Sequence, residues 1–413
     1  MTNRVAVTGL GSVTPLGNTV SQSWDALMAC QSGIGPITCM DASTFSVKIA
    51  GEASEFDPKV VIPGRELNKI DRYAQLAIVA SDEAIKDASL STEVYEPGRI
   101  GVVIGTGVGG LSTVEQNLKT FYEKGSRRIS PFVVPKMMCN AASGQVSIYH
   151  GFKGPNFAVV TACASANHSI GEAYRLIKYG FADAIVTGGS EAAITILSLG
   201  GFSNAKALST QYQDAPTTAS RPFDKTRDGF VLAEGAGILV LENLEKAKAR
   251  GAKIYAVLDG YGASGDAYHI TAPAEDGAGG AAAMNDAIVE AGWNKEDVDY
   301  INAHGTSTPR GDVVETLVVK SVFGDHAKNV SISSTKSSTG HTLGAAGGIE
   351  AVFSVKAIEK QVIPATINHN DPDPECDLDY TPNQPKEKKV EKVLSNSLGF
   401  GGHNSVLAFS KLD

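Results

Sequence analysis

Four side chains that could take part in catalysis stand directly after predicted strands, in segments that lie far apart along the chain. Cys163 lies in NFAVVTACASANHSIG and His304 in NAHGTSTPRGD, while Lys336 and His341 share the stretch TKSSTGH. A thiol can attack a carbonyl, and imidazole and backbone N–H groups can hold the negative oxygen that forms. Each residue alone has an ordinary interpretation, as a small buried side chain, a structural histidine or a surface charge. Because parallel sheets bind ligands beyond the carboxyl ends of their strands, the common placement favours one shared site.

The segment around Cys163 predicts a strand, a tight turn and a helix. The apolar run 157–162 is typical of a strand buried on both faces. After the cysteine, apolar residues recur at helical spacing, and Gly180 suits the end of that helix; the recurring residues are Ile170, Ala173, Tyr174 and Ile177. Backbone N–H groups at the helix start should favour thiolate over thiol and could also hold an oxyanion.

Composition excludes several classes of protein. Of 413 residues, 42% are hydrophobic and 44 are glycine, many directly after apolar runs, which favours an α/β protein with tight strand-to-helix turns. A net charge of −9 argues against nucleic acid as a partner. The five cysteines are scattered and odd in number, which indicates a reducing compartment. The N-terminus has no signal-peptide character and no run suits a membrane span, so we expect a cytoplasmic protein.

Glycine-rich segments raise the question of a bound nucleotide. Residues 4–9 predict a strand followed by a glycine-rich turn, but Thr14 stands where a dinucleotide fingerprint needs its third glycine. The segment RIGVVIGTGVGG has the better spacing, with Gly105, Gly107 and Gly110 after a strand and a predicted helix over 111–124. No second strand with a terminal acidic residue follows it, so the motif is weak evidence for nucleotide binding.

The chain divides into two halves with a similar plan. A new series of elements begins near residue 250, and the stretch VSISSTKSSTGHTLGAAGGIEAVFSVKAI resembles the Cys163 stretch in its order of strand, small polar turn and long helix. We therefore predict an ancient duplication with halves 1–250 and 251–413, packed as one compact body. The first half predicts elements at 4–9, 100–105, 157–179 and 183–188, and the second at 253–258, 278–291, 298–303 and 329–360.

Six stretches together resemble the β-ketoacyl-acyl-carrier-protein synthases, and most of all the elongating members of dissociated fatty acid synthesis. They are TACASANHSIG, RPFDKTRDGFVLAEGAG, NAHGTSTPRGD, SSTKSSTGH, CDLDY and SNSLGFGGHN. The resemblance covers essentially the whole chain. It implies a thiolase-like α/β fold, in which two βαβαβαββ halves form five α-β-α-β-α layers, normally in a homodimer.

The same resemblance implies a role for each reactive residue. Cys163 would accept the growing acyl chain from acyl carrier protein, while His304 and His341 would act in the decarboxylation of malonyl-carrier protein. Lys336 would support the two histidines, and Phe400 would gate the cavity between the half-reactions. The backbone N–H groups of Cys163 and Phe400 would form the oxyanion hole. The implied reaction is a decarboxylative Claisen condensation that yields 3-oxoacyl-carrier protein and CO₂, without a resident cofactor, because phosphopantetheine arrives on the carrier.

Three further sets of residues match family positions. The substrate set, for the phosphopantetheine arm and the acyl chain, is Thr271, Thr306, Thr308, Val108 and Phe202. The basic set, for docking of the acidic carrier, is Arg65, Lys69, Arg127, Arg128 and Lys206. The set that ligates a monovalent cation in some relatives is Asn302, Ala303, Glu350, Ser395 and Asn396. From the residues alone, Thr306 and Thr308 would be turn formers beside Pro309, the basic residues ordinary surface charges, and Glu350 a partner for buried donors.

Three residues depart from the family pattern. Ser338 stands where many members have Met, Ala233 where Gly is common and Asn68 where relatives often carry Arg. We expect the first two to affect the packing of the acyl pocket and the third to weaken carrier docking.

The alternative functions are a ketosynthase of a polyketide or specialised lipid pathway, a non-catalytic partner subunit that shapes a pocket, and a cysteine hydrolase. Partner subunits of this kind lack the nucleophile, whereas Cys163 is present here.

Overall fold

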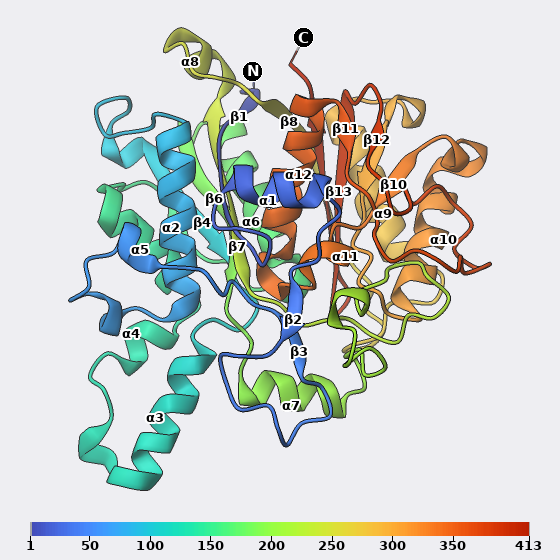
Figure 1. Cartoon of the computed structure of the whole chain (residues 1–413). Helices are drawn as coiled ribbons and strands as arrows, with labels where there is room; N and C mark the ends of the chain where they lie inside the picture. Colours follow the sequence, from blue (N-terminus) through green and yellow to red (C-terminus); the bar gives the residue numbers. More distant parts are fainter. Residues whose placement is uncertain (1, 413) are drawn as a thin grey trace.

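Each half of the chain forms five strands of sheet, and the strand order is equivalent in the two halves. A computed structural model describes residues 2–412, and the strand order is β5-β4-β6-β7-β1 in the first half and β10-β9-β13-β14-β8 in the second. In each half the first three strands are parallel and the last two run antiparallel to their neighbours. A short antiparallel pairing of β1 with β8 joins the halves into one ten-stranded sheet (Figure 1). The predicted duplication is confirmed, because order and direction match strand for strand.

The strands of the large sheet have the following bounds. The first half contributes β1 (Val5–Val13), β4 (Ile100–Gly105), β5 (Asn156–Phe157), β6 (Ala184–Glu191) and β7 (Gly235–Asn243). The second half contributes β8 (Ala256–Gly265), β9 (Tyr300–Asn302), β10 (Ser331–Ser333), β13 (Lys392–Gly399) and β14 (His403–Ser410). Two small hairpin-like pairs lie outside it, namely β2 (Ile34–Pro36) with β3 (Ile49–Gly51) and β11 (Val362–Ile363) with β12 (Lys386–Glu387).

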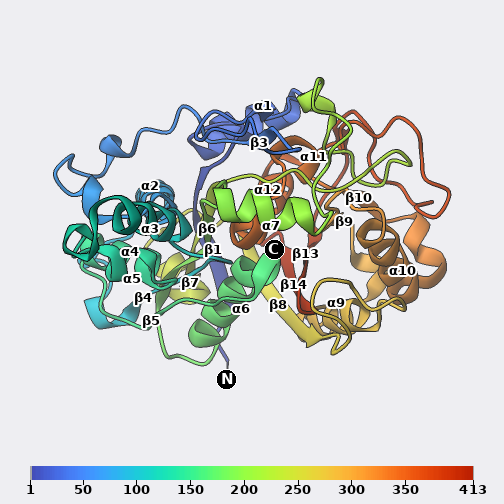
Figure 2. The same cartoon turned by 90° about the horizontal axis from the view of Figure 1, so that it is seen from below.

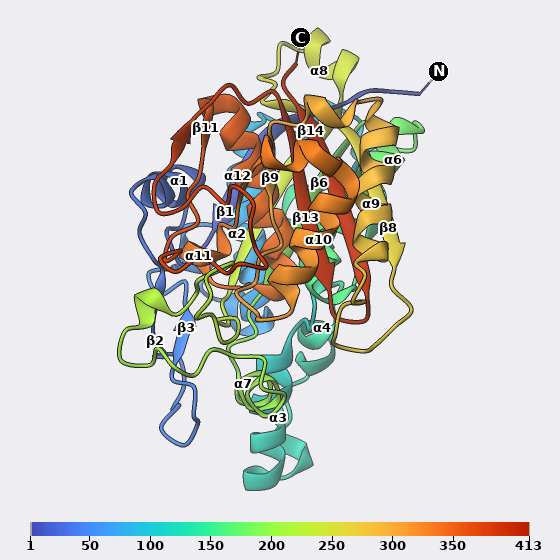
Figure 3. The same cartoon turned by 90° about the vertical axis from the view of Figure 1, so that its right-hand side faces the viewer.

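Helices form three of the five layers. Helices α6 (Ser165–Lys178) and α12 (Ala346–Lys360) lie between the two halves of the sheet, with α2 (Arg72–Asp87) and α5 (Ala141–His150) outside the first half (Figure 2). Helices α9 (Ala278–Ala291) and α10 (Gly311–Phe323) cover the outer face of the second half (Figure 3). The predicted five-layered thiolase-like α/β fold is therefore confirmed. The remaining helices are α1 (Val20–Met28), α3 (Leu111–Lys124), α4 (Val133–Met137), α7 (Ile196–Asn204), α8 (Leu244–Ala249) and α11 (Lys336–Thr339).

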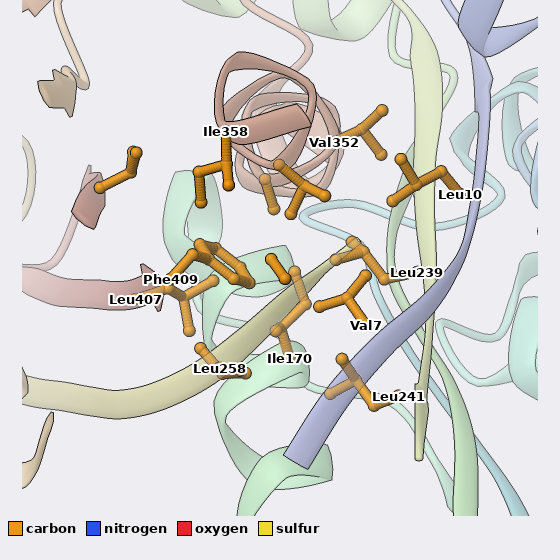
Figure 4. Close-up of a cluster of buried hydrophobic side chains, with 14 of the residues drawn as sticks. Val7, Leu10, Ile170, Leu239, Leu241, Leu258, Val352, Ile358, Leu407 and Phe409 are labelled. Carbon is orange, nitrogen blue, oxygen red and sulfur yellow. The ribbon is translucent and has the colours of Figure 1, made fainter. Parts of the chain in front are cut away.

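The central helices are apolar on nearly every face because sheet covers them from both sides. In α12, almost every residue from Ala346 to Ile358 is buried. Figure 4 shows Val352 and Ile358 of this helix and Ile170 of α6 in contact with side chains from strands of both halves. Each such aliphatic side chain contributes about 1.5–3 kcal/mol on burial. This core holds α6, the helix that follows Cys163, against the second half of the molecule. Within residues 2–412, no helix is long and apolar enough to cross a membrane.

Glycines in β1 and β8 reveal the same helix packing in both halves. The turn predicted after residue 9 is wrong, since β1 continues through this glycine-rich segment. A Cβ atom at Gly11 would lie 1.9 Å from the backbone oxygen of Ala80 in α2, so the strand needs glycine for close approach and not for turning. At Gly262 of β8, a Cβ atom would lie 1.8 Å from the backbone oxygen of Ala283 in α9.

The strand before the cysteine differs from its prediction. We expected a buried strand over 157–162, but β5 ends at Phe157 and the following residues are irregular. This short strand pairs with β4 alone and forms the edge of the sheet, so Phe157 and Val160 remain 37% and 48% exposed. The helix after the cysteine agrees with its prediction, because α6 buries all four of its expected apolar residues.

Candidate active site

Cys163 lies in a strained turn at the start of α6. Residues 162–164 form one 3₁₀ turn, and Ala162 adopts a left-handed conformation with φ of 50°. The Ser165 side chain braces this turn, since its hydroxyl donates to the Ala162 carbonyl and accepts from the Thr161 N–H. The turn places a buried thiol at the junction between the two halves of the molecule. Such strain in a non-glycine residue costs about 1–2 kcal/mol and is common at functional sites.

Two histidines from the second half complete the group. His341 Nε2 lies 3.0 Å from Cys163 Sγ, and the rings of His341 and His304 are nearly perpendicular with centroids 5.5 Å apart. One ligand-forming atom from each of the three residues lies within 4.8 Å of the others. The backbone holds both histidines: the N–H of His304 donates to Glu315, and that of His341 donates to the Val231 carbonyl. Cys163 and two histidines that lie far from it along the chain therefore form one compact site.

Burial, together with a nearby positive charge, keeps both imidazoles neutral. Lys336 and Glu350 form an ion pair in which each side chain is 2% exposed. Burial and the positive charge of Lys336 lower the pKa of His304 well below its ordinary value, and the same two causes lower the pKa of His341. Lys336 thus acts on the histidines through its charge. Neutral imidazoles can donate an N–H to a developing oxyanion without carrying a charge into the cavity.

The protonation state of Cys163 differs from the prediction. Burial raises the pKa of the thiol to about 11, although Lys336 and the Phe400 backbone N–H both act to lower it. The expectation that the helix start favours the thiolate is therefore wrong for the resting site, since desolvation outweighs it. The sulfur is a thiol at neutral pH, and its proton must leave when the sulfur attacks.

A glycine-rich loop between β13 and β14 closes the site. Gly399 approaches the turn so closely that a Cβ atom there would lie 3.2 Å from the backbone N of Cys163. The backbone N–H of Phe400 points to the Cys163 sulfur. The Phe400 ring lies 6.4 Å from that of Phe202. Gly401 and Gly402 have φ of 84° and 72°, which suits a tight loop.

A cavity of about 410 Å³ contains this group and is lined mainly by apolar side chains. Cys163, His304, His341 and Phe400 all line it, and so do all five residues of the predicted substrate set, namely Val108, Phe202, Thr271, Thr306 and Thr308. The hydroxyls of Thr306 and Thr308 lie 3.1 Å apart. The lining also includes Phe230 and Leu343, which the sequence analysis missed. The FVLAEGAG part of a recognised motif contains Phe230 and could have indicated it.

The predicted carrier-docking residues are spread over three segments. Lys206 lines the mouth of the cavity. Arg65 and Lys69 both contact Glu66, which offsets part of their charge. Arg127 and Arg128 are exposed in a 3₁₀ turn that follows α3 (Figure 1).

The residues of the predicted cation set are all buried at the junction of β9, β13 and α12. Asn302 of β9 stands opposite Ser395 of β13. Within the described part of the chain, side-chain oxygens of four of these residues have no hydrogen-bond partner, namely those of Asn302, Ser395, Asn396 and one oxygen of Glu350. Buried, unpartnered oxygen atoms suit a hard cation, so the residues present fit such an ion.

The departures at residues 233 and 338 lie behind the cavity and do not line it. The Ala233 N–H donates to the His341 carbonyl, and the Ser338 carbonyl accepts from the Gly33 N–H. Neither residue lines the cavity, so an effect on the packing of the acyl pocket would be indirect, and it stays a prediction. Asn68 lies in the 3₁₀ turn Leu67–Lys69.

Comparison with known proteins agrees with this site. Residues 2–247 match the β-ketoacyl synthase N-terminal domain, and residues 255–370 match the β-ketoacyl synthase C-terminal domain. The chain therefore belongs to the β-ketoacyl synthase family. It is 52% identical to the 3-oxoacyl-[acyl-carrier-protein] synthase 2 of Synechocystis over 408 residues, which is 99% of this chain and 98% of the relative. The identity to the Staphylococcus aureus protein of the same name is also 52%, over 99% of both chains.

Solved structures show the same fold over the whole chain. A ketosynthase bound to the hexaketide, in complex with a type II polyketide synthase acyl-carrier protein, superposes with a TM-score of 0.93 at 36% identity, covering 100% of both chains. A β-ketoacyl synthase from Burkholderia phymatum superposes with a TM-score of 0.92 at 34% identity, again over 100% of both chains.

Proposed function

We propose that this protein condenses an acyl chain held on Cys163 with malonyl-acyl-carrier protein, giving 3-oxoacyl-acyl-carrier protein and CO₂ in type II fatty acid elongation. One observation carries the proposal: a buried thiol and two neutral imidazoles meet within 4.8 Å in a largely apolar cavity. The relatives at 52% identity are named 3-oxoacyl-[acyl-carrier-protein] synthase 2, after the product proposed here, which supports the same reaction.

Acyl transfer to Cys163 is the first half-reaction. The sulfur attacks the carbonyl carbon of the acyl thioester, and the N–H groups of Cys163 and Phe400 hold the oxyanion that forms. The bond between the carbonyl carbon and the carrier thiol then breaks, and that thiol leaves with the proton lost by Cys163. His341 Nε2, 3.0 Å from the sulfur, is placed to relay this proton.

Decarboxylation of malonyl thioester is the second half-reaction. The bond to the carboxylate breaks and releases CO₂, and its electron pair forms an enolate at the thioester. Neutral His304 and His341 can each donate an N–H to that enolate oxygen, and one such donor contributes on the order of 3 kcal/mol. The enolate carbon attacks the acyl carbonyl, the bond to Cys163 breaks, and the chain is two carbons longer. The sulfur leaves as a thiolate and takes up one proton from water, which restores the resting thiol. An apolar cavity excludes the water that would otherwise hydrolyse the acyl-enzyme.

The test uses purified protein with acyl-carrier substrates of graded length and malonyl-carrier protein, with products read by mass. We expect 3-oxoacyl products two carbons longer than the starter. A Cys163→Gln variant should lose condensation while still releasing CO₂ from malonyl thioester. Equal loss of both activities would contradict the assigned division of labour between the cysteine and the histidines.

The same assay separates the alternatives. Rapid release of free acid from an acyl thioester would indicate a cysteine hydrolase, whereas an acyl-enzyme that persists by intact mass argues against one. A ketosynthase of a polyketide or specialised lipid pathway would extend its product more than once without reduction of the keto group. A chain that neither acylates nor decarboxylates would be a pocket-shaping partner subunit.

Acyl carrier protein is the partner that this reaction requires, and we place the protein in the cytoplasm with it. Exposed Arg127 and Arg128 offer positive charge to an acidic carrier on a chain of net charge −9. Reversing both to Glu should raise the apparent KM for carrier-bound acyl chains and leave short thioester analogues unaffected. An unchanged KM for carrier-bound substrates would reject this docking surface.

A second copy of the chain is the occupant we propose for an exposed apolar surface near the acyl cavity. The surface spans α3, the segment 129–138 and the edge segment after β5, and α3 projects from the body of the molecule (Figure 1). Its exposed side chains are Leu118, Phe121, Tyr122, Ile129, Phe132, Val134, Met137, Met138, Phe157 and Val160. A surface of this extent is unfavourable in water and typical of an interface. Sedimentation should give twice the mass of one chain, and the mass of a single chain would contradict the homodimer.

A monovalent cation is the occupant we propose for the unpartnered oxygens around Asn302 and Asn396. When bound, it would supply positive charge beside the Lys336–Glu350 pair and fix the strands that carry His304 and the glycine-rich loop. Melting temperature should rise with KCl or NaCl more than with choline chloride at equal ionic strength. Identical melting curves in the three salts would contradict a cation at this place.

A further inference from the structure

Glu191 is a fully buried carboxylate behind the cavity wall, and the reaction described above does not use it. It ends β6, has a relative exposure of 0% and accepts four hydrogen bonds. The donors are the hydroxyl of Thr106 at 2.8 Å and the backbone N–H groups of Gly107 at 2.6 Å, Val108 at 3.3 Å and Gly344 at 3.1 Å.

These donors belong to two loops from different halves of the chain. Residues 106–108 follow β4 in the first half, whereas Gly344 precedes α12 in the second. The loops touch directly: a Cβ atom at Gly344 would lie 2.2 Å from the backbone N of Gly107 and 2.7 Å from Glu191 Oε2. The carboxylate therefore binds both loops at the point where the halves meet.

Both loops contribute walls of the acyl cavity. Val108 comes from the first loop, and Leu343 comes directly before Gly344 in the second. Leu343 packs in the same apolar cluster as Cys163 and Phe230. It adopts a left-handed conformation with φ of 47°, which is unfavourable for a leucine. The bond from the Gly344 N–H to Glu191 holds the peptide that follows this strained residue and thereby keeps the Leu343 side chain at the cavity.

The electrostatic setting of Glu191 also argues for a specific role. All four of its donors are neutral, and burial raises the pKa of the carboxyl to about 7 despite them. By contrast, the buried carboxylate of Glu242 on the neighbouring strand β7 is neutralised by Arg250. Burying a carboxylate without a cation is costly, so its four bonds to the cavity loops must offset that cost.

We propose that Glu191 is a positioning residue that sets the accepted acyl chain lengths by binding the two loops that carry Val108 and Leu343. The proposal rests on the function proposed above. It predicts that loss of the carboxylate changes which chains fit the cavity, and does not change the chemistry at Cys163.

The test compares Glu191→Gln with a matched control, Glu242→Gln. Both changes replace a fully buried carboxylate in the same sheet by its amide, but Glu242 bonds Thr8, Tyr95 and Arg250, which lie outside the cavity lining. In Glu191→Gln the side-chain NH₂ faces backbone N–H donors in either orientation: that of Val108 at the Oε1 position, or those of Gly107 and Gly344 at the Oε2 position. We expect the ratio of kcat/KM between long and short acyl-carrier substrates to change at least about tenfold in Glu191→Gln. In Glu242→Gln we expect a lower melting temperature and an unchanged ratio.

A second variant keeps the test valid if Glu191→Gln fails to fold. Thr106→Val removes one donor to Glu191 with little change in shape, and it should shift the ratio in the same direction by a smaller factor. Length profiles of Glu191→Gln or Thr106→Val that parallel wild type would overturn the proposal, and so would an equal shift in Glu242→Gln. If wild-type protein extends no acyl chain at all, the proposed function fails instead.

Discussion

His304 and His341 should separate the two half-reactions when each is replaced by Ala. His341 Nε2 lies 3.0 Å from Cys163 Sγ, whereas His304 contacts the His341 ring, with ring centroids 5.5 Å apart. Both rings face the cavity as neutral N–H donors, so both should stabilise the enolate. In a Cys163→Gln background, each replacement should slow CO₂ release by about 10²–10³, which corresponds to about 3–4 kcal/mol for one lost donor.

Acyl transfer should respond differently to the two replacements. With Cys163 intact, His304→Ala should keep the rate of acyl-enzyme formation within about tenfold, because the oxyanion donors of this step are backbone N–H groups. His341→Ala removes the ring that contacts the sulfur, and it should slow acyl transfer by more than His304→Ala does.

The assay measures CO₂ release from malonyl-carrier protein and the appearance of acyl-enzyme by intact mass. His326→Ala is the control, because this half-buried histidine lies outside the cavity lining and should leave both rates unchanged. Melting curves report whether each variant is folded. His304→Ala would contradict these roles if it slowed acyl transfer as much as it slows CO₂ release. Either replacement would contradict them if it left CO₂ release within about tenfold of its parent.

Three further predictions follow from the pKa shifts and from one buried arginine. Because the pKa values of His304 and His341 are depressed, the imidazoles stay neutral as pH falls from 8 to 6, so CO₂ release by Cys163→Gln should be constant over this range; a decline centred near pH 6.5 would contradict it. Because the pKa of the Cys163 thiol is raised to about 11, alkylation by iodoacetamide should accelerate about tenfold per pH unit between pH 7 and 10; a rate already level at pH 8 would indicate a thiolate. Buried Arg227 donates to the carbonyls of Thr308 and Pro309, and Arg227→Lys keeps the charge but loses this forked contact. Steady-state kinetics should then show a higher KM for carrier-bound thioesters with kcat changed by less than about threefold, and a change confined to kcat would contradict a role in substrate binding.

The elements that the sequence predicted best are those whose pattern is local. The helices expected over 111–124 and 278–291 coincide with α3 and α9, because apolar spacing and glycine at the ends act within one segment. The matching order of strands and helices in the two halves could be predicted for the same reason, because it also rests on patterns within single segments. The family resemblance also named ten side chains of the cavity lining, since the chemistry needs those residue types.

Burial and approach between distant segments were decided by the tertiary structure. The apolar run 157–162 became an exposed edge because nothing in the described chain pairs with its outer side. The glycines of β1 allow α2 to pack closely against the strand. This requirement comes from a different element, so the sequence of β1 alone does not reveal it. The raised thiol pKa has the same origin, since desolvation comes from the layers that enclose Cys163.

The sequence by itself determined the fold class and the reactive groups, because periodicity and residue chemistry are properties of each segment. Only the tertiary structure decided their working state, namely a neutral thiol, two neutral imidazoles and a cavity whose walls are held by Glu191. The physical reason is that protonation and cavity shape depend on distances and dielectric environment, and folding sets these between residues that are far apart in the chain.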